Sequence, residues 1–258
     1  MASKGLVCHF YNEEMMLPHF VKHHLPIFDE AVFINHRSTD NSCGIIRELA
    51  PHWKIVNTRL KSFDALLNDY KVMDIEENEL KTDWKMALNV TEFMFNSNLD
   101  RVIEEYGQQY EALGHRAYFL VDKTANKPML DPVWLNRTEG FLDDGAVMAS
   151  RNWRVIHRRE HGHYHLGRHF TNLSAHCNPD WNILFFAFAP WPEAFNRKLQ
   201  IQTQIPDSDK VKGYGIQHIQ TPFTLLQKYK EMCQKVEDLT KNPVFMEHYN
   251  HFKEKSLV

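Results

Sequence analysis

The sequence is poor in cysteine and has no long hydrophobic run. None of the four cysteines in its 258 residues forms a CxxC pair: Cys8, Cys43, Cys177 and Cys233. This spacing excludes a disulfide framework and a cysteine-rich zinc site, and it favours a reducing, cytoplasmic location. The longest apolar run, residues 183–191, is far shorter than the roughly 20 residues that span a bilayer. We therefore expect a core strand there and no transmembrane segment.

The chain also lacks a large excess of charge of either sign. Its formal net charge is −3 at pH 7, and no block of like charges is present. Such a balance gives no reason to expect a nucleic-acid partner or a charged tail. The first fourteen residues hold too short an apolar run for a signal peptide. With 43% hydrophobic and 24% charged residues, the composition is that of a globular domain with a substantial core.

Strand and helix patterns alternate through the first half of the sequence. Short apolar strands are expected over residues 5–10, 31–35, 54–57 and 83–88. Apolar residues at helical spacing separate them, over 13–24, 42–49 and 62–81. This alternation is typical of parallel βαβ units. We predict an α/β protein with an open mixed sheet of Rossmann-type units flanked by helices.

The second half is less regular. A strand is expected over 117–121, and one or two more within 146–156. Residues 197–214 are predicted to be extended or loop structure. An amphipathic helix is predicted over 221–235 and a last helix over 243–255.

Polar residues follow three of the predicted strands, after Phe10, after Ile34 and after Leu88. The carboxyl ends of parallel strands meet at one edge of a sheet, and ligands bind beyond that edge. Each polar group alone could be a capped turn. Three of them at equivalent strand ends favour a binding site.

Three short motifs stand at these strand ends. They are Asn12-Glu13, Ser38-Thr39-Asp40, and the segment from Asp83-Trp84 to Glu92-Phe93. In this order they resemble the opening of family 2-type glycosyltransferases with the GT-A fold. More narrowly, they resemble a small subgroup in which the third motif reads Asp-x-Asp-Glu-Phe. Residues 217–221, QHIQT, resemble the subgroup's C-terminal His before a helix.

The resemblance implies an enzyme of polysaccharide biosynthesis that transfers a sugar from a nucleotide-sugar donor. The acceptor would be a glycan, a lipid-linked molecule or a protein, and the anomeric centre would be inverted. A single GT-A-like domain, 1–258, would comprise a nucleotide-sugar-binding half (1–95), an acceptor-side half (96–220) and C-terminal helices (221–258). The residues implied to bind the nucleotide sugar are Tyr11, Asn12, Glu13, Asn35, Ser38, Thr39, Asp40 and Lys198.

The third motif departs from the subgroup's pattern. In the family it holds Mn²⁺ or Mg²⁺ through aspartates, but Asn89 and Thr91 stand at those positions and only Glu92 keeps a charge. Hard cations favour anionic oxygen ligands. One possibility is a weakened metal site made by Asn89, Thr91, Glu92 and His218.

Two other possibilities remain open at this motif. Cationic side chains could neutralise the leaving diphosphate in place of a metal, with three candidates: Arg197, Lys198 and Lys228. Alternatively, the protein could have lost transfer activity and be a catalytically silent nucleotide-sugar-binding or glycan-binding protein.

Inverting transfer also requires a base that deprotonates the acceptor hydroxyl. Asp180, in Asn-Pro-Asp-Trp, is the first candidate and Asp144 is the second. Asn-Pro-Asp is also a common turn sequence. A histidine is a further option, because its unperturbed pKa lies near neutrality.

Five histidines crowd into residues 157–169, HRREHGHYHLGRH. If the segment is a strand, His161, His163 and His165 share one face. Such a face could form a transition-metal site, line an acceptor pocket or pack structurally. A His-rich metal hydrolase is therefore a less favoured alternative function.

Overall fold

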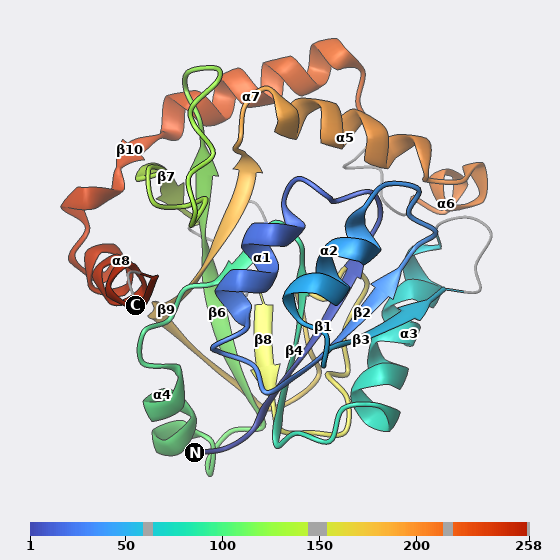
Figure 1. Cartoon of the computed structure of the whole chain (residues 1–258), viewed down its shortest axis with the longest axis vertical. Helices are drawn as coiled ribbons and strands as arrows, with labels where there is room; N and C mark the ends of the chain where they lie inside the picture. The colour runs from blue at the N-terminus through green and yellow to red at the C-terminus, as the bar shows by residue number, and fades with distance from the viewer. Residues whose placement is uncertain (59–63, 144–153, 214–218, 257–258) are drawn as a thin grey trace.

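The computed structural model of the chain describes residues 1–58, 64–143, 154–213 and 219–256 (Figure 1). The first half forms four parallel strands in the spatial order β4-β1-β2-β3. They are β1 (Lys4–Phe10), β2 (Glu30–Asn35), β3 (Lys54–Asn57) and β4 (Trp84–Asn89). Three helices connect them: α1 (Leu17–His24), α2 (Ser42–Leu49) and α3 (Ala65–Asn78). The predicted parallel βαβ units are confirmed.

Both faces of this parallel sheet are covered. Successive side chains of a strand point to opposite faces. Leu6 and Phe10 of β1 therefore join the large core cluster with α1 and α2, whereas Val7 joins a smaller cluster with Val72 and Ile75 of α3. Burial on both faces explains why these strands are nearly continuous hydrophobic runs.

The second half extends the same sheet with mixed strand directions. β8 (Arg154–His157) lies antiparallel between β4 and β6 (Ala112–Val121), so β6 runs in the direction of β4. β9 (Ala175–Phe188) is parallel to β6 and pairs on its other side with the short β5 (Glu92–Met94). β7 (Glu139–Leu142) and β10 (Glu237–Asp238) complete the sheet. The predicted α/β class with an open mixed sheet is confirmed, and the apolar run 183–191 is mostly a core strand, as expected.

The prediction of extended and loop structure over 197–214 is wrong. Residues there belong to α5 (Glu193–Thr203) and α6 (Asp207–Val211). Phe195 and Leu199 lie four residues apart on α5 and pack against the main core. Besides these two, Ala194 is buried, and most other residues of the helix are polar, so its periodicity is faint in the sequence.

The remaining helices include the two predicted near the C-terminus. They are α4 (Leu99–Tyr106), α7 (Pro222–Lys235), the short 3₁₀ helix η2 (Leu239–Lys241) and α8 (Pro243–Ser256). In Figure 1, α5, α6 and α7 lie across the end of the sheet to which β1, β2 and β4 point. Within the described ranges, no helix is long and apolar enough to cross a membrane. All four cysteines are free thiols.

Candidate functional site

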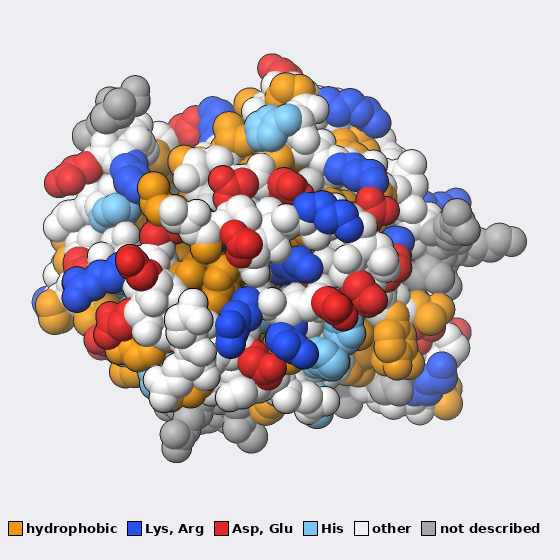
Figure 2. All heavy atoms as spheres, turned by 90° about the horizontal axis from the view of Figure 1, so that it is seen from below, with side chains coloured by type: hydrophobic (Ala, Val, Ile, Leu, Met, Phe, Trp, Pro, Cys, Tyr) orange, Lys and Arg blue, Asp and Glu red, His pale blue; other side chains and the backbone are white. Residues whose placement is uncertain are grey.

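The carboxyl ends of β1, β2 and β4 form one edge of the sheet, which we call the carboxyl edge. In the strand register Phe10 lies beside Asn35 of β2, and His9 lies beside Asn89 of β4. The three polar groups that follow these strands are therefore neighbours, as the sequence predicted. The opposite end of the molecule, seen from below in Figure 2, mixes acidic and basic side chains over its surface.

The first two polar groups interlock with each other. The Asn12 backbone N–H donates to Ser38 Oγ at 3.0 Å, and the Thr39 N–H donates to Asn12 Oδ1 at 2.8 Å. The Ser38 N–H donates in turn to Asn35 Oδ1 at 2.8 Å. Asn12 adopts a positive φ of 49°, which asparagine tolerates better than most residues. Asn12, Asn35 and Ser38 thus shape the two loops at the carboxyl edge.

Asp40 serves the same loops. Its Oδ2 accepts from the Glu14 N–H at 3.0 Å and its Oδ1 accepts from the Ser42 N–H at 3.0 Å, at the start of α2. This is the capping role that the sequence left open beside nucleotide binding. Tyr11, by contrast, is partly exposed, and its ring lies 6.3 Å from that of His36 in an edge-on arrangement. It leaves an aromatic surface beside the loops.

Glu13 connects the carboxyl edge to α5. Its carboxylate is buried and accepts from Arg197 Nε, at 2.7 Å to Oε1 and 2.9 Å to Oε2. Because Arg197 lies on α5, this ion pair fixes the helix over the end of β1. Glu13 is therefore paired with Arg197, and Lys198, the next residue on α5, lies at the same edge.

The third polar group holds a buried ion pair. Glu92 is 1% exposed, and its carboxylate is paired with Arg154 of β8 at 2.7 Å (Oε1 to Nη2) and 2.8 Å (Oε2 to Nε). The Asn89 N–H donates to Glu92 Oε2 at 2.8 Å. Burial alone would raise the pKa of Glu92, but Arg154 and the Asn89 N–H outweigh burial and hold that pKa below its usual value. The carboxylate is ionised and fully hydrogen-bonded.

A second arginine holds Asn89. Arg168 Nη2 donates to Asn89 Oδ1 at 2.9 Å, and Arg168 also pairs with Asp69 of α3. The Gly167 N–H donates to the same aspartate at 2.7 Å, so the loop before Arg168 is tied to α3 as well. Thr91 is buried, and its carbonyl accepts from the Phe186 N–H at 2.9 Å within the β5–β9 pairing.

The described residues of this motif do not fit a divalent cation. The oxygen of Asn89 and both oxygens of Glu92 already accept hydrogen bonds from guanidinium groups. A cation would have to displace Arg154 or Arg168 from a buried carboxylate or amide, which is unfavourable. Among the residues that the structure describes, no group of three or more His, Cys, Asp or Glu side chains could hold a metal. His218, the predicted fourth ligand, lies outside the described residues.

Lys198 follows Arg197 on α5, and Lys228 of α7 acts on it electrostatically. Lys198 of α5 points its Nζ at the Phe188 ring of β9, 4.9 Å from the centroid, and lies 5.9 Å from that of Phe185. Burial, together with the charges of Arg197 and Lys228, lowers the pKa of Lys198 to about 7. Within the described ranges, no carboxylate forms a salt bridge with Lys198.

The charges around Cys8 confirm that these groups surround the end of β1. Burial raises the pKa of the Cys8 thiol, and Glu13 and Glu92 raise it further, whereas Arg168 and Arg197 oppose the increase. Four charged side chains from widely separated parts of the sequence therefore act on one residue near the end of β1. The carboxyl edge is a concentrated array of buried charge.

Asp180, the predicted base, does not join this array. It lies within β9, and its carbonyl accepts from His248 of α8 at 2.9 Å. Its carboxylate also acts on Tyr118, whose pKa is raised to about 12, mainly by burial and then by Asp180. Asp180 thus belongs to the flank of the sheet covered by α8. Asp144, the second candidate, lies outside the described residues.

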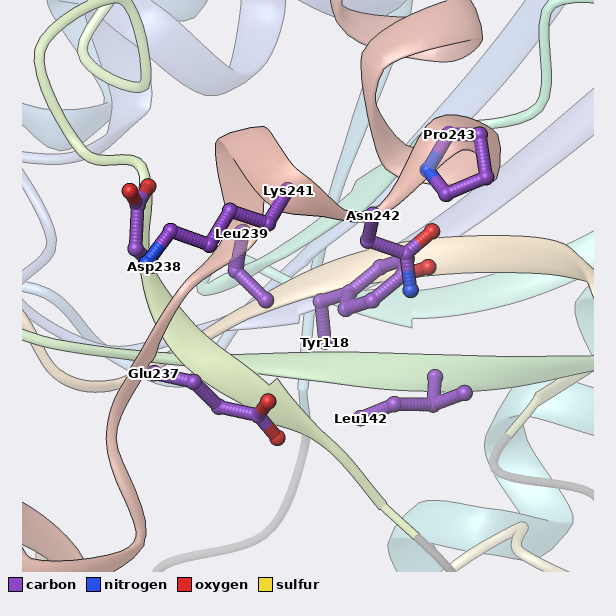
Figure 3. Close-up of a pocket in the computed structure, with 8 residues that line it drawn as sticks. All are labelled: Tyr118, Leu142, Glu237, Asp238, Leu239, Lys241, Asn242 and Pro243. Carbon is purple, nitrogen blue, oxygen red and sulfur yellow. The ribbon is translucent and has the colours of Figure 1, made fainter.

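A cavity of about 280 Å³ lies on that same flank (Figure 3). Figure 3 shows lining residues from β6, β7, β10, η2 and the start of α8, with Glu237, Asp238 and Lys241 among them. β8 and β6 separate this flank from β4 in the sheet order, so the cavity is distinct from the carboxyl edge.

The predicted strand of alternating histidines is wrong. Residues 158–172 contain bends and turns with one isolated bridge, between Tyr164 and Thr171. His163 has a positive φ of 45°, and the rings of His161 and His163 lie 4.0 Å apart rather than in a row of three. The metal-hydrolase alternative loses its structural basis among the described residues.

This histidine segment is anchored to α3 by a buried carboxylate. Glu76, fully buried, accepts from the Tyr164 hydroxyl at 2.8 Å and from the Gly162 N–H at 2.9 Å. The anchor holds the loop that carries Gly167 and Arg168 against the sheet. Two histidines of the segment join the same framework, because His157 Nε2 lies 3.3 Å from Glu76 Oε2 and His169 Nδ1 lies 2.9 Å from Arg154 Nη1.

We expect Tyr164→Phe to lower the free energy of unfolding by roughly 1–3 kcal/mol, because it removes a hydrogen bond from a buried carboxylate. Chemical denaturation measures the change. Tyr70→Phe, on the exposed face of α3, is the control and should change stability by less than about 0.5 kcal/mol. Equal stability of the two variants would show that the hydrogen bond from Tyr164 to Glu76 contributes nothing.

Sequence reasoning missed Asp69, Arg154 and Arg168. No local pattern marks them, because Arg154 meets Glu92 across 62 residues and Arg168 meets Asn89 across 79. Their role follows only from the pairing of β8 with β4 and from the loop that crosses to α3.

No protein-family model and no curated protein matches this sequence. Several solved structures resemble its fold at low identity. A mannosyltransferase from Pyrobaculum calidifontis in complex with GDP-Man and Mn²⁺ is 11% identical with a TM-score of 0.49, over 79% of this chain and 62% of that one. Residues 1–349 of S. aureus TarS are 11% identical with a TM-score of 0.45, over 76% and 64%.

Glucosyl-3-phosphoglycerate synthase from Mycobacterium tuberculosis, in complex with Mn²⁺, UDP and glucosyl-3-phosphoglycerate, is 9% identical. Its TM-score is 0.34, over 46% of this chain and 44% of that one. The present chain thus spans less than two thirds of the length of each of these proteins.

Proposed function

We propose that the carboxyl edge binds a nucleotide sugar and that the protein is a glycosyltransferase. The observation that carries this proposal is the convergence of three polar motifs at the ends of β1, β2 and β4. Ligands of open α/β sheets bind at such an edge. The motifs are those on which the sequence resembles family 2-type glycosyltransferases.

Different residues of the carboxyl edge are proposed to bind different parts of the nucleotide sugar. Tyr11 offers its partly exposed ring to the base, and the loops held by Asn12, Ser38 and Asp40 supply polar groups to the nucleoside. We place the phosphates of the donor beside Lys198 of α5 and Lys228 of α7. Positive charge fixed at that position stabilises a leaving diphosphate, which is the main electrostatic demand of the transfer.

The acceptor is proposed to be a hydroxyl of a glycan, a lipid-linked molecule or a protein, and the transfer to be inverting. Asp180 and the cavity of Figure 3 lie on the α8 flank, and we do not include them in the donor site. No step of the proposal passes through a metal ion, because the described ligands do not fit one.

A catalytically silent nucleotide-sugar-binding protein is the second candidate. Asn89 and Thr91 favour it, because they replace two anionic positions of the family's motif with neutral groups. The two candidates predict the same binding and different turnover. A donor hydrolysis or transfer assay with UDP- and GDP-sugars distinguishes them.

A thermal-shift screen tests the proposal. UDP, GDP, ADP, CDP and dTDP are compared with inorganic phosphate, and one nucleoside diphosphate should raise the melting temperature. At a ligand concentration of 100 Kd the expected stabilisation is about 2.7 kcal/mol. If none of the five nucleotides shifts the melting temperature, the proposed function is wrong.

We expect Tyr11→Ala to weaken binding of the preferred nucleotide roughly fivefold, because it removes a stacking surface worth about 1 kcal/mol. Isothermal titration calorimetry measures the dissociation constant. Tyr70→Ala, on the exposed surface of α3, is the matched control and should leave binding unchanged. A Tyr11 variant that binds like the wild type would exclude base stacking at this position.

A further inference from the structure

The position of Lys198 is fixed by its surroundings. Arg197, the preceding residue on α5, is held by the buried carboxylate of Glu13. On the other side, the Trp191 and Tyr229 rings stack with centroids 3.7 Å apart, and the Tyr229 hydroxyl donates to the Asp122 carbonyl at 2.9 Å. These contacts join α5 to the end of β1, and join α7 to the end of β6 and to the residues between β9 and α5. Lys198 therefore lies on a helix that is attached to the sheet at both ends of this contact network.

Among the residues that the structure describes, Lys198 differs from the buried arginines in having no carboxylate partner. Arg137 pairs with Asp122, Arg154 with Glu92, and Arg168 with Asp69. Lys198 instead lies over the Phe188 and Phe185 rings, and within the described ranges no acidic side chain pairs with it. A cation over an aromatic face recovers only part of the solvation that it loses. Such an arrangement leaves the ammonium able to take an anion.

At the third motif, by contrast, the side-chain oxygens that would bind a metal already accept hydrogen bonds from arginines. The Asn89 side-chain oxygen accepts from Arg168, and the Glu92 carboxylate accepts from Arg154. Both arginines are neutralised by carboxylates, because Arg168 also pairs with Asp69. They hold the motif together but add little net positive charge for a ligand. The uncompensated positive charge of the carboxyl edge lies on α5 and α7 instead.

We propose, resting on the nucleotide-sugar function above, that Lys198 binds the donor's diphosphate together with Lys228 and takes the electrostatic role of the divalent cation. Arg197 stays paired with Glu13 and holds α5 in position. Phosphate oxygens accept strong hydrogen bonds from ammonium groups. The ligand class is a nucleoside diphosphate or its sugar ester, bound without metal.

Proton uptake is the signature of this contact. Among the described residues, the groups that face Lys198 are Arg197 on its own helix, Lys228 on α7 and the Phe185 and Phe188 rings of β9. All of the charged ones are positive, so the free ammonium is destabilised and a bound diphosphate restores it. At pH 8 binding should therefore take up protons, and calorimetry in buffers of different ionisation enthalpy detects this.

The decisive experiment compares Lys198→Met with Lys230→Met, an exposed residue of α7, in buffer containing EDTA. UDP and GDP are titrated into each protein, and uridine and guanosine serve as probes without phosphates. For the preferred base, Lys198→Met should weaken diphosphate binding by roughly tenfold or more and abolish the proton uptake. Nucleoside binding should not change, and Lys230→Met should behave like the wild type. Lys198→Arg, which keeps the charge, should restore most of the affinity.

The outcomes separate this inference from the function on which it rests. If the wild type binds neither diphosphates nor nucleosides, the proposed function fails and this inference fails with it. If the wild type binds a diphosphate and Lys198→Met binds it equally well, the function stands and the role of Lys198 is wrong. A folded Lys198→Met that loses diphosphate and nucleoside binding equally would also contradict a specific phosphate contact.

Discussion

Arg154→Met should lower the free energy of unfolding by about 3–5 kcal/mol, the cost of breaking a buried ion pair from one side. The variant would leave Glu92, 1% exposed, without the two guanidinium hydrogen bonds that now measure 2.7 and 2.8 Å. Arg154 also donates to the Gly167 carbonyl at 3.1 Å, so the loop that carries Arg168 would loosen. Urea denaturation followed by circular dichroism measures the change.

Two control variants test whether the loss of stability comes from leaving Glu92 buried and unpaired. Arg159→Met removes a cation from an exposed pair with Glu111, and it should cost less than about 1 kcal/mol. The double variant Glu92→Met/Arg154→Met replaces the buried pair with apolar groups and should recover most of the lost stability. If Arg154→Met costs no more than Arg159→Met, the ion pair does not organise the motif.

Lys198→Met should have the opposite effect and stabilise the ligand-free protein. The pKa of Lys198 falls from 10.5 to about 7 on folding, and each unit corresponds to about 1.4 kcal/mol. Because solvent reaches part of the side chain, we expect a gain of roughly 2–4 kcal/mol at pH 6. Methionine keeps apolar contact with the Phe185 and Phe188 rings of β9.

The stabilising effect of Lys198→Met should depend on pH. Between pH 7 and 10.5 the unfolded chain binds more protons at Lys198 than the folded chain does, so the wild type gains stability as the pH rises. The cost of the lysine is complete below about pH 7 and disappears above its unfolded pKa. The difference between the variant and the wild type should shrink from pH 6 to pH 10. A Lys198→Met variant that is less stable than the wild type at pH 6 would contradict the destabilised ammonium.

Arg154 and Lys198 have opposite effects on stability at the carboxyl edge. Arg154 stabilises the fold because its charge is neutralised, whereas Lys198 destabilises the fold because its charge is not. A residue that costs stability in the free protein is typical of a functional site. The pair of variants therefore separates the framework of the site from its binding group.

The parallel half of the fold could be predicted because its signals are local. Strand and helix periodicities lie within single windows of sequence, and β1 to β4 follow them closely. The convergence of the polar motifs followed from topology alone, since parallel strands must end at one edge. Helix α5 was missed because few apolar residues mark its buried face, namely Ala194, Phe195 and Leu199.

The chemistry of the third motif could not be predicted in the same way. The sequence shows that Asn89 and Thr91 carry no charge, but it does not show which residues meet them. Arg154 and Arg168 reach Glu92 and Asn89 through strand pairing and a loop crossing. The position of Asp180 could not be predicted either, because its spacing in the sequence does not show that β9 carries it to the α8 flank.

The most direct test of metal-free diphosphate binding is the dissociation constant of the preferred nucleoside diphosphate, measured calorimetrically in EDTA and again with Mn²⁺. If side-chain cations bind the phosphates, the two constants should agree within about twofold. An increase in affinity of more than about tenfold with Mn²⁺ would contradict the account, because a metal would then supply the charge assigned to Lys198.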